Sequence, residues 1–336
     1  MKSGTKPRIL LLTTGGTITM VTDPEKGLVP CSAADSIIQR IPEIAQLAEM
    51  DFLPLANTDS SNILPSLWPE IAKALYERWN DYDGFVVTHG TDTLSYTAAA
   101  ISFMIQETDK PVVFTGSQVP LEETGSDGRA NLINAFRVAI SDLAEPVVVF
   151  GSLIIKATRA KKTSAFDLQA FTSANVPPLG TIGLSIRLEP NRRVRSRRKP
   201  LFQPFLNESV AMIPVYPGMN PDIITFLAEK HSGIVLEGYG AGNIPTEGRS
   251  LVPVIQRTVE SGVPIVICTQ CLFGSTEMEL YQVGRAALDA GAIPAIDMTP
   301  ETTFAKLMWV LGQTNDLKTV ESLMQKSFLG ELHEGG

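Results

Sequence analysis

Hydroxyl, carboxylate and amine side chains occur at a few places where they could act together on a carbonyl group. A hydroxyl attacks a carbonyl carbon when an adjacent base removes its proton, and a lysine amine can be that base. We predict such a site here, with Lys162 as the base and Asp92 holding the lysine in place. The hydroxyls and carboxylates all follow short apolar runs, and they are Thr14, Asp59 to Ser61, Thr91 with Asp92, and Ser117.

Lys162 can act as a base only after it has lost its own proton. Burial and a neighbouring cation both favour the neutral amine, and Arg159 or Lys161 could be that cation. The negative charge of Asp92 has the opposite effect, and the sequence leaves this balance open.

Other kinds of catalytic site fit the sequence less well. A Ser-His-Asp hydrolase would have to use His89, which is equally well explained as a structural histidine before a helix. Cys268 and Cys271 resemble a redox pair, but no helix signal follows them at once. The sequence has no spaced set of metal ligands and no glycine-rich nucleotide motif, so we expect neither a metal nor a cofactor.

The elements that must position these residues alternate between short apolar runs and segments of helical period. Ile9–Leu12 and Phe85–Val87 are continuously apolar, as in strands that are buried on both faces. The residues Thr91, Asp92 and Thr93 also suit a helix N-terminus, so they could simply be caps. Strands and helices in this order predict a mostly parallel, doubly wound sheet, in which ligands bind beyond the carboxyl ends of the strands.

The chain of 336 residues is long enough for two domains. We expect a larger N-terminal α/β domain over residues 1–188, a basic linker over 189–211, and a smaller C-terminal α/β domain over 212–336. The arginine-rich stretch 192–199 is either a solvated linker, which we favour, or an RNA-binding strip. Residues 20–30 have the composition of a mobile loop, and His333 falls in a C-terminal tail.

Composition excludes several classes of partner. A net charge of −8 argues against general binding to nucleic acid or to an anionic membrane surface. The apolar run near the N-terminus is too short for a signal peptide or a membrane span. Three cysteines, including Cys31, cannot form a disulfide framework, so we expect a cytoplasmic protein.

Several motifs together resemble the bacterial-type L-asparaginases, in particular their cytosolic type I branch. The resemblance extends over nearly the whole chain. Its motifs are Thr14-Gly15-Gly16-Thr17-Ile18, Asp59-Ser60-Ser61, His89-Gly90-Thr91-Asp92-Thr93, Thr115-Gly116-Ser117-Gln118, Ser126-Asp127-Gly128, Tyr239-Gly240-Ala241-Gly242-Asn243, Thr269-Gln270-Cys271 and Asp297-Met298-Thr299.

The resemblance implies a role for each matching residue. Thr14 is similar to the threonine that attacks the side-chain amide of asparagine, which gives an acyl-enzyme and ammonia. Thr91, Asp92 and Lys162 resemble the set that activates a nucleophile or the hydrolytic water. Lys162 is chosen over Lys161 by its spacing to Phe171, Ser173 and Asn175. The groups implied in holding the substrate's α-amino and α-carboxylate are Asp59, Ser60, Ser61, Thr91 and Asp92.

The resemblance also implies an assembly and a substrate. The family fold has two α/β domains, and its active sites are completed across a homodimer, either alone or as a dimer of dimers. Asn243 is then the likeliest contribution of the C-terminal domain. The implied reaction is hydrolysis of L-asparagine to L-aspartate and ammonia, with L-glutamine as a second possible substrate.

Two positions depart from the family pattern. Many asparaginases carry a tyrosine in the loop after the first motif, but residues 20–30 contain none, and Leu28 falls near that place. Some type I enzymes bind a second, activating asparagine through an arginine where this chain has Glu237. Because Glu237 repels a carboxylate, we expect simple saturation kinetics.

Two alternatives remain open from the sequence. One is an ammonia-releasing subunit of a tRNA-dependent amidotransferase, which the basic stretch favours, although the additional N-terminal domain of such subunits is not recognised here. The other is a non-catalytic asparagine or aspartate sensor on the same scaffold, since a fold does not fix a function. The set Thr14, Thr91, Asp92 and Lys162 argues against a sensor.

Overall fold

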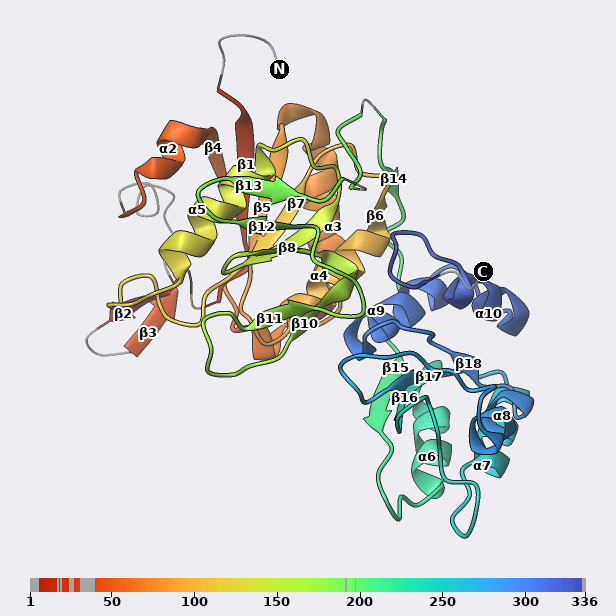
Figure 1. Ribbon diagram of the computed structural model, residues 1–336. Coiled ribbons are helices and arrows are strands. Elements are labelled where there is room, and N and C mark those ends of the chain that lie inside the picture. Colours follow the sequence, from red (N-terminus) through yellow and green to blue (C-terminus); the bar gives the residue numbers. More distant parts are fainter. Residues whose placement is uncertain are drawn as a thin grey trace. The chain divides into compact units, whose positions relative to one another are not determined.

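The computed structural model describes residues 6–16, 18, 20–23, 27–30, 40–190, 192–196 and 198–333. Thr17 and Cys31, both considered above, lie outside the described residues. The chain divides into two compact units, Met1–Phe202 and Gln203–Gly336 (Figure 1). Each unit is an α/β structure with its own sheet.

The sheet of the first unit has the strand order β13-β12-β9-β8-β7-β5-β1-β4. Its strands from β8 to β4 run parallel to their neighbours, and β1 and β5 are buried almost throughout. The predicted fold class, a mostly parallel sheet followed by a smaller α/β unit, is confirmed. The parallel strands are β1 (Arg8–Thr13), β4 (Glu49–Pro54), β5 (Gly84–Thr88), β7 (Val112–Thr115) and β8 (Pro146–Phe150).

One edge of this sheet turns antiparallel. Strand β9 pairs antiparallel with β8, β12 with β9, and β13 with β12. No α-helix lies between β9 and β13 in the chain. These three strands are β9 (Leu153–Lys156), β12 (Gly180–Ile182) and β13 (Ile186–Leu188).

Two groups of helices pack against this sheet. The helix α5 (Gly128–Ala139) and the short α2 (Glu43–Leu47) share a buried cluster with alternate residues of the strands, including Ile9, Leu11 and Val86. The helices α3 (Leu67–Glu77) and α4 (Leu94–Met104) pack against each other, and α4 contacts β7 and β8.

Three two-stranded ribbons are present among the described residues of the first unit. Residues 20–30, expected to be a loop, contain an antiparallel pair instead. Strand β10, which carries Lys162, pairs with β11. The ribbons are β2 (Met20–Asp23) with β3 (Gly27–Pro30), β6 (Ile105–Gln106) with β14 (Leu201–Phe202), and β10 (Ala160–Lys162) with β11 (Phe171–Ser173).

The basic stretch makes specific contacts within the first unit. The Arg192 guanidinium forms an ion pair of 2.6 Å with Asp142. Arg195 donates to three backbone carbonyls, those of Asp83, Ala139 and Ser141. Burial lowers the pKa of Arg195. These two arginines therefore tie residues 192–195 to the end of α5 and the turn after it.

The second unit contains a four-stranded parallel sheet in the order β15-β16-β17-β18. The helices α6, α7 and α8 share an apolar cluster with it, whereas α9 contacts β15, β16 and β17 and packs against α10. The elements are β15 (Val210–Pro214), α6 (Asp222–Lys230), β16 (Gly233–Gly238), α7 (Val252–Glu260), β17 (Ile265–Thr269), α8 (Gln282–Asp289), β18 (Ile293–Pro294), α9 (Pro300–Leu311) and α10 (Leu317–Gln325).

The segment after α10 is packed into the second unit, and the backbone N–H of His333 donates to Asp297 at 2.9 Å, so the expectation that His333 lies in a C-terminal tail is wrong. Leu329, Glu331 and Leu332 are buried. Lys306 of α9 and Glu331 form an ion pair of 2.7 Å in which both side chains are fully buried. The Lys306 ammonium also donates to the carbonyls of Met324 and Lys326, at 3.0 and 2.6 Å. Buried leucines and a buried charge pair thus both hold this segment in place.

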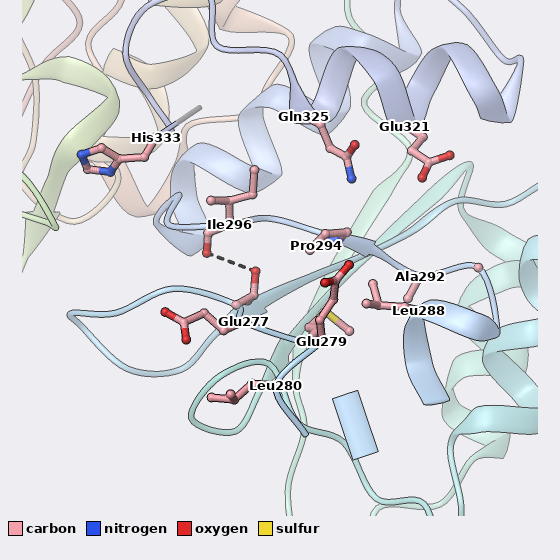
Figure 2. A pocket seen from close by; sticks show the side chains of 13 residues that line it. Glu277, Glu279, Leu280, Leu288, Ala292, Pro294, Ile296, Glu321, Gln325 and His333 are labelled. Carbon is pink, nitrogen blue, oxygen red and sulfur yellow. Dashed lines mark hydrogen bonds between the residues drawn. The ribbon is translucent and has the colours of Figure 1, made fainter. Parts of the chain in front are cut away.

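The second unit also contains an open pocket of about 1020 Å³ between α8, β18 and α10. Figure 2 shows Glu279 and Gln325 reaching into this space from opposite sides, with Pro294 between them.

Candidate active site

Three polar segments meet at the carboxyl edge of the first unit's sheet. Strand β1 lies between β4 and β5, and all three run in the same direction, so their ends fall at one edge. Thr13 pairs with Pro54 on one side and with Thr88 on the other. Residues 14–16, 57–62 and 88–92 therefore come together, as the sequence predicts.

Two glycines allow these segments to approach each other closely. Gly15 and Gly16 have φ values of +107° and +85°, which residues with side chains rarely adopt. A Cβ atom on Gly15 would lie 2.4 Å from the carbonyl oxygen of Thr58, and one on Gly16 would lie 2.4 Å from the backbone nitrogen of Gly90. The backbone of the first turn is thus locked against the other two segments.

Thr14 is fully buried at this junction. Its backbone N–H and its hydroxyl both donate to the carbonyl of Thr88, at 3.1 and 3.0 Å. Its own carbonyl accepts from the backbone N–H of Thr58 at 3.0 Å. These bonds fix the position and the rotamer of the Thr14 side chain.

The second segment forms a single turn of 3₁₀ helix, Ser60–Asn62, that begins after Asp59. The Asp59 carboxylate accepts from the backbone N–H of Ser61 at 2.8 Å, so it caps this turn. The carbonyl of Ser60 accepts from the Thr93 hydroxyl at 2.8 Å, and the Ser61 hydroxyl lies 3.4 Å from Asp92. This segment thus contacts the segment that follows β5.

Lys162 is brought to the third segment by β10. Its Nζ donates to the Thr91 hydroxyl at 2.8 Å and to the Asp92 carboxylate at 2.7 Å. The side chain of Lys162 is 21% exposed and that of Asp92 is 60% exposed. The hydrogen bond from Lys162 is the main cause that lowers the pKa of Asp92. A hydroxyl, a carboxylate and an amine therefore meet at a site open to solvent.

The alternative that these residues cap a helix is wrong. Helix α4 begins at Leu94, and its N-cap residue, Thr93, makes no side-chain capping bond. The Thr93 hydroxyl instead donates to Ser60. Thr91 and Asp92 are directed to Lys162.

Two residues to which sequence reasoning gave no role join this group. The Thr91 hydroxyl donates to Oε1 of Gln118 at 3.0 Å. The backbone N–H of Gln118 in turn lies 3.0 and 3.1 Å from the two carboxylate oxygens of Asp127. Both residues lie in motifs noted above, but their spacing along the chain gave no sign of this contact.

His89 has a structural environment. It is fully buried, and this burial lowers its pKa to about 4, so the ring is neutral near pH 7. Its ring nitrogens contact the carbonyl of Gly90 and the hydroxyl of Thr97, and that hydroxyl accepts from the Trp68 indole. These contacts use both nitrogens, so His89 is not available to activate a nucleophile.

Asn243 lies in the loop after β16, in the second unit. Its backbone pairs with Tyr239, and its side-chain oxygen is buried without a hydrogen-bond partner. Its contribution to a site stays a prediction. Ser117 is likewise buried with its hydroxyl unpartnered, at the end of β7.

Metal ligands, membrane-length helices and cysteines bear on other kinds of function. Within the described part of the chain, no group of three or more His, Cys, Asp or Glu side chains could hold a metal ion. None of its helices is long and apolar enough to cross a bilayer. Cys268 is buried and Cys271 is exposed.

Comparison with known proteins follows the same division of the chain. Residues 8–194 match the family model described as Asparaginase, N-terminal, and residues 209–324 match the Glutaminase/Asparaginase C-terminal domain. An L-asparaginase of Thermococcus kodakarensis is 41% identical, over 97% of this chain and 99% of the relative. The solved structure of the thermostable L-asparaginase from that organism has a TM-score of 0.91 at 39% identity, covering 97% of this chain and 99% of its own.

Two further relatives have different descriptions. A subunit of the glutamyl-tRNA(Gln) amidotransferase of Pyrococcus furiosus is 40% identical, over 97% of this chain and 77% of the relative. A solved structure of a probable cytoplasmic L-asparaginase from Campylobacter jejuni has a TM-score of 0.81 at 28% identity, covering 96% of this chain and all of its own.

Proposed function

This chain belongs to the asparaginase family, and from that premise we propose that it hydrolyses the side-chain amide of L-asparagine to L-aspartate and ammonia, with Thr14 as the nucleophile. The enzyme class is amidohydrolase. The contact of Lys162 with both Thr91 and Asp92 is the observation that supports assigning these three residues to the proton transfers.

The reaction has two halves. In the first, the Thr14 oxygen bonds to the amide carbon, its proton passes to the leaving nitrogen, and ammonia departs from a threonine ester. In the second, water attacks the ester carbon, its proton returns to Thr14, and aspartate is released. Each half passes through an oxyanion, and one well-placed donor to such an oxyanion typically lowers the barrier by about 3 kcal/mol.

Lys162 serves the proton transfers. In the resting geometry its ammonium donates to Thr91 and Asp92. After losing a proton it accepts one through the Thr91 hydroxyl, from Thr14 or from the hydrolytic water. Asp92 keeps the amine in place throughout, because its carboxylate stays charged well into the acid range.

The substrate's charged ends require polar partners beside the nucleophile. We assign the α-amino and α-carboxylate groups to Asp59, Ser60, Ser61, Thr91 and Asp92. Support comes from the exposed carboxylate of Asp92, which suits an ammonium group, and from the contact of Ser61 with it. The Asp59 carboxylate already accepts one backbone bond and has further lone pairs to offer a substrate ammonium.

We further propose a cytoplasmic homodimer, alone or as a dimer of dimers, in which Asn243 of a second copy completes each site. The unpartnered side-chain oxygen of Asn243 supports a ligand or partner contact there. Mixing inactive Thr14→Ala with inactive Asn243→Ala after subunit exchange should restore part of the activity. Complete absence of recovery in exchanged dimers would contradict a shared site.

Ammonia release by the purified chain alone tests the main proposal. We expect release from L-asparagine, and slower release from L-glutamine, at rates proportional to enzyme concentration. The Lys162→Met variant is the control, because methionine keeps an unbranched side chain and lacks the amine. Silence of the wild-type protein with both amides, in a sample shown to be folded, would overturn the proposal.

A second candidate rests on the 40% identity to the glutamyl-tRNA(Gln) amidotransferase relative. A subunit of that kind would free ammonia for a partner rather than for solution. The same assay separates the two functions, because rapid turnover without any added partner or tRNA favours the hydrolase. Turnover of glutamine that requires both additions would favour the amidotransferase function.

A further inference from the structure

The hydrogen bonds around Thr91 have a defined direction. A lysine ammonium can only donate, so Thr91 accepts from Lys162, and its single hydroxyl hydrogen goes to Oε1 of Gln118. The Gln118 amide nitrogen then donates to the carbonyl of Asp167 at 3.3 Å. Since a carbonyl can only accept, the orientation of the Gln118 amide is determined by partners at both of its ends.

The backbone of Gln118 is fixed by a different group. The Asp127 carboxylate accepts from the backbone N–H of Gln118 at 3.0 and 3.1 Å and from that of Val119 at 3.1 Å. Asp127 precedes α5, yet it makes no capping bond to that helix. Its side chain reaches back eight and nine residues to the turn that follows β7.

Asn131, one turn into α5, anchors Asp127. Its side-chain nitrogen donates to Asp127 and to the carbonyl of Gly116, each at 2.9 Å, and its oxygen accepts from the N–H of Gly151 at 2.9 Å. Asn131 is 1% exposed and Asp127 is 8% exposed. These two buried side chains tie the start of α5 to the ends of β7 and β8. The backbone of Gln118 is therefore held in place by well-packed elements.

We propose that Asp127 is a positioning residue for the Thr91–Lys162 pair, and that it acts through Gln118. This inference rests on the proposed function, because it concerns the proton transfers assigned to that pair. Gln118 fixes the Thr91 hydroxyl oxygen beside the amine, and the Thr91 hydrogen turns from Gln118 to Lys162 when the neutral amine accepts it. A displaced Gln118 frees the Thr91 side chain to rotate, so its oxygen then lies beside the amine in only a fraction of molecules.

A double-mutant cycle tests the inference. The variants are Asp127→Ala, Gln118→Leu and the combination of both, with Asp127→Asn as a conservative version that keeps one acceptor oxygen. Misplacement of reacting groups by about 1 Å costs up to roughly 100-fold in rate, so we expect kcat to fall by about tenfold to 100-fold in each single variant. We expect KM to change little, and Asp127→Asn to retain more activity than Asp127→Ala.

The decisive result concerns additivity. If Asp127 acts through Gln118, the double variant should be no slower than the slower single variant, because mutations along one path do not add. Losses that multiply, or wild-type kcat in Gln118→Leu, would overturn the inference. Should Asp127→Ala not fold, Gln118→Leu together with Asp127→Asn decides the matter in the same way.

Asp316→Ala is the matched control. Asp316 is also a carboxylate before a helix, where it accepts from the N–H and hydroxyl of Thr319, but it lies in the second unit. We expect its loss to lower stability and to leave kcat unchanged. Activity of the wild-type protein reports separately on the proposed function: an inactive wild type defeats both proposals, whereas an active wild type with unaffected variants defeats only this one.

Discussion

The Nζ atom of Lys162 lies 2.8 Å from the hydroxyl oxygen of Thr91, although the two residues are 71 positions apart in the sequence. The short strand β10 makes this possible, because it packs against α4 near the segment that carries Thr91. The amine therefore comes from outside the main sheet, while the hydroxyls come from its strand ends.

Removal of the amine should stop turnover. We expect Lys162→Met to lower kcat by at least about a thousandfold, as is typical when one member of a catalytic set is removed. Asp92→Ala should also abolish turnover, because it leaves the amine without its partner at 2.7 Å. Initial rates of ammonia release measure both effects, with circular dichroism as the check on folding. Retained activity in either variant would exclude its residue from the machinery.

Thr14 should be indispensable for the acyl-enzyme. We expect Thr14→Ala to be inactive and folded, with a stability loss of about 1 kcal/mol for the missing hydrogen bond to Thr88. Thr14→Ser keeps a hydroxyl and should retain measurable turnover. Mass spectrometry of acid-quenched enzyme with asparagine should find an aspartyl adduct on Thr14. An adduct on Thr91 instead would make Thr91 the nucleophile and would contradict this role for Thr14.

His89 makes stability depend on pH. Its pKa is about 4 in the folded protein and 6.5 ordinarily, so the unfolded chain binds more protons between these values. Stability is therefore lost as pH falls from about 6.5 to about 4, by roughly 3 kcal/mol in total. Urea unfolding at several pH values should show a smaller loss over this range in His89→Gln than in the wild type. Parallel curves for the two proteins would refute this account.

The buried pair in the second unit should be sensitive to one-sided substitution. Glu331→Gln leaves the Lys306 ammonium buried without its counter-charge, which typically costs about 3–5 kcal/mol. The double variant Lys306→Met with Glu331→Leu removes both charges and should cost less than Glu331→Gln alone. Chemical denaturation of the three proteins measures the difference. A double variant less stable than Glu331→Gln would contradict this prediction.

Glu237 should prevent activation by a second asparagine. Its carboxylate occupies the end of β16, where an arginine would attract the ligand. We expect the rate of the wild type to depend hyperbolically on asparagine concentration. If a sigmoidal dependence can be created, we expect it in the Glu237→Arg variant. A clearly sigmoidal curve for the wild type counts against this expectation.

Sequence reasoning located the sheet and its active edge because the relevant signals are local. Runs such as Ile9–Leu12 and Phe85–Val87 are apolar throughout, which is characteristic of strands covered on both faces. Parallel strands place their carboxyl ends together, so Thr14 and Thr91 could be assigned to one edge. The antiparallel edge was not predicted, because β12 and β13 have only three residues each and no strong alternation.

The parts that were missed depend on side-chain direction. Asp127 looks like a helix cap, and its actual partners are backbone groups of a turn that the sequence does not show to be adjacent. Thr91 and Asp92 likewise suit a cap until Lys162 is placed beside them. The pairing of Glu331 with Lys306 joins residues 25 positions apart in a segment with no periodic pattern. Such contacts arise only once the chain has folded.

The close approach of Gly15 and Gly16 to Thr58 and Gly90 limits how this protein can be re-engineered. Backbone meets backbone there, so an insertion or a larger residue in the first turn would force three segments apart at once. A designer who wishes to change amide selectivity must therefore leave this framework intact. The useful freedom lies in side chains that extend from it, such as Ser61, whose hydroxyl lies 3.4 Å from Asp92.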